Sequence, residues 1–80
     1  MANVKFEGHE YEYDETAVKS YTLFRQISRL AEDPGGFFDG MSRLFCGHDV
    51  EYAQQLGDDI DKMGELISAV MEDAGRDAKN

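Results

Sequence analysis

Apolar residues in the C-terminal part of the chain recur at alternating intervals of three and four residues, which restricts the fold more than any other feature. Steps of three and four place such residues on one face of an α-helix. Asp49 is suited to cap its start, so the pattern predicts one long helix over residues 50–74. The series comprises Ala53, Leu56, Ile60, Met63, Ile67, Val70 and Ala74.

This apolar series requires a packing partner. It can pack on a helix predicted upstream, or it can pair with a second copy of the chain. The upstream helix is net basic and residues 50–74 are strongly acidic, which favours packing within one chain. Gly57 and Gly64 each follow a member of the series. Glycine costs about 1 kcal/mol in a helix interior, so we expect both to permit close approach of a neighbouring helix or ring.

Residues 3–13 show the alternation of a β-hairpin. Val4 and Phe6 alternate with polar residues, as do Tyr11 and Tyr13, and Gly8 lies between the two runs. A turn at Gly8-His9 would set Phe6 opposite Tyr11, whereas a turn at Glu7-Gly8 would set Val4 opposite Tyr11. Either register places the apolar side chains on one face, which must lie on the helices.

Two further helices are predicted between the hairpin and the long helix. Asp14 caps a helix over residues 15–31, and Asp33 with Pro34 starts a second helix over 34–46, which ends at Gly47. The first has an apolar stripe formed by Ala17, Val18, Tyr21, Phe24, Ile27 and Ala31, widened by Leu23 and Leu30.

The chain of 80 residues is therefore expected to form one mainly α domain of the α+β class. Its N-terminal hairpin packs on a three-helix bundle whose last helix is long. Residues 76–80 form a polar tail that we expect to be frayed.

The charge balance restricts the partners. A net charge of −9 opposes binding to nucleic acid or to an anionic membrane, because both require Lys and Arg side chains. Cys46 is the single cysteine, which fits a reducing cytosol. Neither a signal-peptide pattern nor a stretch of about 18 apolar residues is present, so we expect a cytoplasmic protein.

Candidate reactive groups are few. Cys46 and His48 could form a nucleophilic pair, but the sequence identifies no acidic residue that would orient the histidine and no oxyanion-stabilising set, so packing is the favoured role. One cysteine and two distant histidines fall short of a zinc site. A calcium loop starting at Asp59 would place Met63 and Val70 at ligand positions. We therefore expect no catalytic residue, no cofactor and no metal, and a role in binding another protein.

The helix over 34–46 carries the strongest candidate docking surface. Its apolar side chains follow one helix face, and three of them are aromatic. We expect about half of this stripe to fill the core and the rest to form an exposed patch that marks an interface. The predicted protein-binding residues are Phe37, Phe38, Met41, Leu44 and Phe45, together with the charged side chains of Asp58, Asp59 and Asp61.

The arrangement as a whole resembles a known family. The segment VKFEGHEYEYDE precedes a helix, which is followed by DPGGFFDGMSRLFCGHDVEYAQQLGDDIDKMGELISAVMEDAG and a terminal AKN. Size, acidity and element order resemble the small tail assembly chaperones of long-tailed bacteriophages and prophages. The resemblance implies a non-enzymatic viral protein of the host cytoplasm, absent from the mature virion. Such chaperones keep the tape-measure protein soluble and recruit tail-tube subunits, and many have a frameshifted longer form.

A different class of function remains open. Small acidic phage proteins can inhibit host defence proteins by imitating DNA, with carboxylates in place of phosphates. Such a mimic would bind a basic nucleic-acid-binding cleft, with an affinity that falls steeply with salt. The carboxylates available for this role are those of Asp58, Asp59, Asp61, Glu65, Glu72 and Asp73.

Overall fold

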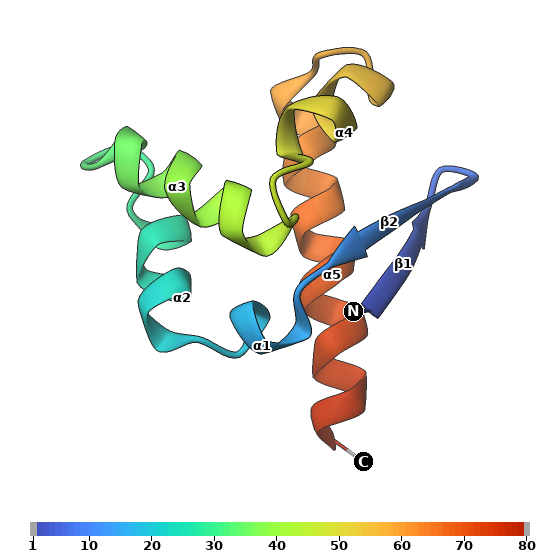
Figure 1. The fold of residues 1–80 in the computed structure, drawn as a ribbon, viewed down its shortest axis with the longest axis horizontal. Coiled ribbons are helices and arrows are strands. Elements are labelled where there is room, and N and C mark those ends of the chain that lie inside the picture. Colours follow the sequence, from blue (N-terminus) through green and yellow to red (C-terminus); the bar gives the residue numbers. More distant parts are fainter. Residues whose placement is uncertain (1, 80) are drawn as a thin grey trace.

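The structure is a computed structural model that describes residues 2–79. A two-stranded antiparallel hairpin is followed by five helices, and the last helix is the longest (Figure 1). The α+β class and the N-terminal hairpin are confirmed, whereas five helices replace the expected three. The elements are β1 (Ala2–Phe6), β2 (His9–Tyr13), α1 (Glu15–Val18), α2 (Tyr21–Ser28), α3 (Pro34–Leu44), α4 (Asp49–Gln55) and α5 (Ile60–Lys79).

The hairpin adopts the second of the two predicted registers. Glu7 and Gly8 form the turn with φ values of 50° and 83°. Positive φ at both central residues is the geometry of a tight two-residue hairpin turn. Val4 therefore lies opposite Tyr11, and Phe6 lies opposite His9.

The helix expected over 15–31 is two helices. Asp14 caps α1 as predicted, with Oδ1 accepting from the Thr16 amide at 2.9 Å. Ser20 then caps the start of α2, because its Oγ accepts a hydrogen bond from the Leu23 amide at 3.2 Å. A side chain that satisfies free amides in this way begins a new helix and ends the previous one. The expected helix 34–46 starts at Pro34, with Asp33 as its cap, and ends at Leu44.

The helix expected over 50–74 is interrupted, so the prediction of one continuous helix was wrong. Gly57 and Asp58 have φ values of 81° and 57°, which no α-helix contains. Asp59 then caps α5, with Oδ1 accepting from the Asp61 amide at 2.8 Å. At the other end α5 continues to Lys79 through the segment expected to be a frayed tail, and residue 80 lies outside the described residues.

The close approach expected at two glycines occurs at a third. Gly57 is needed for its positive φ, and a Cβ added at Gly57 or Gly64 would meet no atom within 4 Å. At Gly40 on α3, an added Cβ would lie 3.3 Å from Gln26 Cβ on α2. The absence of a side chain at Gly40 thus brings α2 and α3 together, while Gly64 faces open space.

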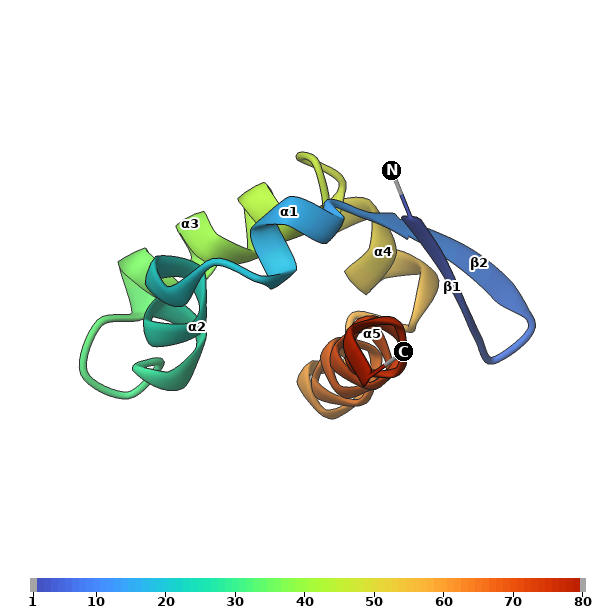
Figure 2. The same cartoon turned by 90° about the horizontal axis from the view of Figure 1, so that it is seen from below.

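The hairpin is fixed along the length of α5. The Tyr13 hydroxyl donates to Asp73 Oδ2 at 2.7 Å, and Lys62 Nζ lies 2.5 Å from Glu7 Oε2. The hydrogen bond with Glu7 raises the pKa of Lys62. Figure 2 shows the hairpin and α5 on one side of the molecule and α2 with α3 on the other. The core between them is formed by Val4, Tyr11, Tyr13, Ala17, Leu23, Phe37, Met41, Leu44, Phe45, Leu56, Met63, Leu66, Val70 and Ala74.

One buried polar atom in this core has a cost that can be measured. The Tyr11 hydroxyl is fully buried and has no hydrogen-bond partner among the described residues. An unsatisfied hydroxyl costs about 1–3 kcal/mol, so Tyr11→Phe is expected to raise the free energy of unfolding by about 1 kcal/mol. Urea denaturation at pH 7 measures the change. Tyr21→Phe is the matched control, because Tyr21 is exposed and its hydroxyl stays in water.

The stability advantage of Tyr11→Phe over the wild type should be larger at alkaline pH. Burial raises the pKa of Tyr11, so its neutral form is favoured in the folded state. Because the folded state favours the neutral phenol, this preference stabilises the fold fully below pH 10.0, the ordinary pKa of tyrosine in the unfolded chain. The contribution is lost as the pH rises through the pKa of Tyr11 in the folded state. The wild type therefore loses more stability than Tyr11→Phe between pH 7 and about pH 10.5. A variant that is less stable than the wild type at both pH values would contradict the prediction.

Candidate protein-binding groove

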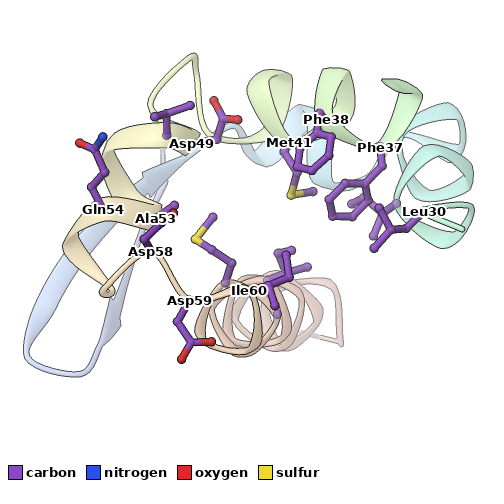
Figure 3. Close-up of a pocket in the computed structure, with 15 residues that line it drawn as sticks. Leu30, Phe37, Phe38, Met41, Asp49, Ala53, Gln54, Asp58, Asp59 and Ile60 are labelled. Atoms are coloured by element: carbon purple, nitrogen blue, oxygen red, sulfur yellow. The ribbon is translucent and has the colours of Figure 1, made fainter. Parts of the chain in front are cut away.

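An open apolar groove separates α3 from the first half of α5. Figure 3 shows α3 above it and α5 below it, with α4 at one end and α2 at the other. Its volume is about 750 Å³, within the range of roughly 300–1,000 Å³ that binding pockets occupy. It is lined by Ile27, Leu30, Phe37, Phe38, Met41, Asp49, Val50, Ala53, Gln54, Asp58, Asp59, Ile60, Met63, Gly64 and Ile67.

The groove contains most of the large apolar side chains that reach solvent. Of the six exposed ones among the described residues, four line it, and a gathered apolar surface marks an interaction site more than scattered residues do. Their exposed fractions are 64% for Val50, 63% for Ile60, 54% for Phe38 and 39% for Leu30.

Helix α3 divides the predicted aromatic stripe between the groove and the core. Phe37, Phe38 and Met41 extend from α3 toward α5 in Figure 3. Phe37 and Met41 are buried at the base of this wall, and Phe38 packs edge-on against Phe37 with ring centres 5.1 Å apart. The N-cap at Asp33 and the contact of Gly40 with α2 hold this half of α3 in place. These three side chains therefore form one wall of the groove.

Leu44 and Phe45 do not line the groove. Both are fully buried, and the Leu44 carbonyl accepts from the Asp14 amide at 2.8 Å, which ties the end of α3 to the hairpin. The Phe45 ring packs edge-on against Tyr52 of α4 at 5.5 Å between centres. Their place in the predicted binding set is corrected on this ground, because a side chain without exposed surface cannot touch a partner unless the core opens.

Of the three carboxylates predicted to bind a partner, two line the groove and one does not. Asp58 and Asp59 lie in the turn between α4 and α5 and line the groove, and Asp49 at the start of α4 joins them. Asp61 is exposed in the first turn of α5 and does not line the groove. The groove thus has an acidic end at α4 and the following turn.

Helix α5 carries two apolar faces, where the spacing predicted one. Leu66, Val70 and Ala74 are buried and belong to the core beneath the hairpin and α1. Ile60 and Ile67 line the groove, and Gly64 between them leaves its surface without a side chain. The apolar series in the sequence contained both isoleucines, but it combined them with core residues and omitted Leu66.

The remaining chemical groups offer little for catalysis. Burial raises the pKa of the Cys46 thiol, and the nearby carboxylates of Asp14 and Glu12 raise it further, which disfavours the nucleophilic thiolate. His48 Nδ1 lies 3.4 Å from Glu51 Oε1. Among the described side chains, no group of three or more His, Cys, Asp or Glu residues is placed to hold a metal ion.

The described helices include none with the length and apolar character needed to cross a membrane. Comparison of the chain with protein-family models, with curated proteins and with solved structures found no match.

Proposed function

We propose that this chain is a non-enzymatic binding protein whose groove receives an amphipathic helix of another polypeptide. The observation that carries the proposal is the open groove between α3 and α5, with Phe38, Val50 and Ile60 at its surface. A helix that places apolar side chains at i, i+3, i+4 and i+7 docks in a groove of this kind. Burying these exposed side chains would contribute about 25 cal/mol for each Å² removed from water.

The partner proposed is the tape-measure protein of a long-tailed bacteriophage. The support is the resemblance of size, acidity and element order in the sequence, together with the groove. A tape-measure protein is long, helical and amphipathic, so its apolar face requires cover before tail-tube subunits surround it. In this role the chain acts in the host cytoplasm, recruits tail-tube subunits and is absent from the mature virion.

The groove supports this proposal better than the acidic surface supports DNA mimicry. One of the six carboxylates proposed for the mimic already has a side-chain partner within the chain, since Asp73 accepts a hydrogen bond from Tyr13. A mimic needs a regular row of carboxylates that are free to meet basic side chains, whereas a docking groove needs exposed apolar surface.

Co-expression tests the proposal. The chain is produced together with the tape-measure protein encoded in the same genome, and the soluble fraction is measured with and without it. We expect the tape-measure protein to precipitate alone and to remain soluble in a complex that survives about 0.5 M salt, because screening at that concentration removes most surface attraction. A tape-measure protein that is equally insoluble in both cases contradicts the proposed partner. A complex that dissociates at that salt concentration favours the acidic mimic.

A further inference from the structure

We infer that the groove selects a helix with a basic flank, whose Lys or Arg side chains lie beside Asp49, Asp58 and Asp59. This inference rests on the proposed function, since it specifies the charge of the helix that the groove receives. It starts from the residues that line the groove: three are acidic, none is Lys, Arg or His, and the acidic ones gather at one end.

The negative charge at this end has no ion-pair partner within the described part of the chain. None of the three carboxylates forms an ion pair with a described residue. Lys62, in the first turn of α5, is the Lys or Arg residue nearest in sequence to Asp58 and Asp59. Its ammonium is hydrogen-bonded to Glu7 at the tip of the hairpin and attracts Asp59 only at longer range. An apolar helix that enters the groove therefore meets three carboxylates without an ion-pair partner, which a basic flank would pair.

The fold uses a side-chain oxygen of Asp59, but it does not need the charge of any of the three carboxylates. Asp59 caps α5 through one oxygen, and Asn caps a helix equally well. Asp58 has a φ of 57°, a conformation that Asn also tolerates. Asp49 occupies the first turn of α4, where the helix dipole favours a carboxylate only modestly. An amide side chain would keep the cap at Asp59 and is tolerated at the other two positions, so the charge is available for a ligand.

Synthetic peptides test the inference. Three amphipathic peptides of about 18 residues share one apolar face and carry Lys, Gln or Glu along its flank. Affinity is measured by titration calorimetry at about 0.05 M salt, where screening is weak. We expect the Lys peptide to bind wild-type protein at least about tenfold more tightly than the Glu peptide, as close charge pairs at interfaces allow.

Two triple variants separate the acidic end of the groove from the overall negative charge. Asp49→Asn/Asp58→Asn/Asp59→Asn should reduce the Lys-over-Glu ratio to about threefold or less. The control triple changes three exposed carboxylates that do not line the groove and alters the net charge equally, so its ratio should stay near that of the wild type. The control is Glu10→Gln/Glu32→Gln/Glu72→Gln.

The other possible results contradict either the charge preference or the groove proposal. Equal Lys-over-Glu affinity ratios in the two triple variants would show that the preference comes from net charge, which would overturn the inference. If the Gln peptide still binds in that case, the groove proposal is unaffected. Failure of all three peptides to bind would overturn the proposed function itself. A wild-type dimer that Phe38→Asp disperses would show that a second copy fills the groove, and it would also overturn the inference.

Discussion

Phe38→Asp is expected to weaken docking of an amphipathic helix in the groove at least a hundredfold and to leave the fold intact. Phe38 forms part of the α3 wall, and more than half of its surface already faces solvent. A carboxylate at this position would be desolvated against the apolar face of the docked helix, which costs several kcal/mol. Loss of the aromatic contact adds to this cost, since aromatic anchors dominate such interfaces. A hundredfold loss corresponds to about 2.7 kcal/mol.

The measurement uses the Gln-flanked peptide, so that charge attraction does not contribute. Titration calorimetry gives the affinity, and thermal unfolding followed by circular dichroism reports on the fold. Phe24→Asp is the matched control, because Phe24 has an exposed fraction of 58% and lies on α2 outside the groove lining. Equal losses of affinity in the two variants would show that the groove is not the docking site. An unchanged affinity in Phe38→Asp would show the same.

Much of the fold could be predicted because its signals are local. Alternation and Gly8 predicted the hairpin, and Asp14 and Asp33 were identified as the caps of α1 and α3. The break before α5 was missed because the apolar spacing continues across it. Leu56 and Ile60 are four residues apart, which fits a continuous helix, while Gly57 and Asp58 between them take positive φ and start a new direction.

The candidate site was only partly predictable, because burial depends on what lies opposite each side chain. The aromatic stripe on α3 was visible in the sequence, but nothing local separates Phe38, which lines the groove, from Phe45, which contacts Tyr52. Val50 was not singled out, since the groove that it lines forms only when α4 folds back beside α5. Helical spacing identifies apolar faces, and tertiary packing decides which of them stays open.

Phe45→Ala is expected to lower the free energy of unfolding by a large share of its total. Phe45 is fully buried, and its ring lies 5.5 Å from the ring of Tyr52, whose hydroxyl accepts from the Glu12 amide of the hairpin at 3.2 Å. Its removal leaves a cavity where α3, α4 and the hairpin meet. A Phe→Ala change at such a site costs about 3–5 kcal/mol. A domain of this length has a total stability of about 4–12 kcal/mol, so the variant loses a large share of it.

Urea denaturation of Phe45→Ala beside Phe24→Ala checks this expectation. Phe24→Ala removes the same atoms from an exposed position and should change the free energy of unfolding by about 0.5 kcal/mol or less. Similar losses in the two variants would contradict the placement of Phe45 in the core. The same reasoning applies to Leu44→Asp, which buries a charge and should unfold the chain. Loss of binding in either core variant would therefore report unfolding, whereas a change at an exposed groove residue such as Phe38 reports docking.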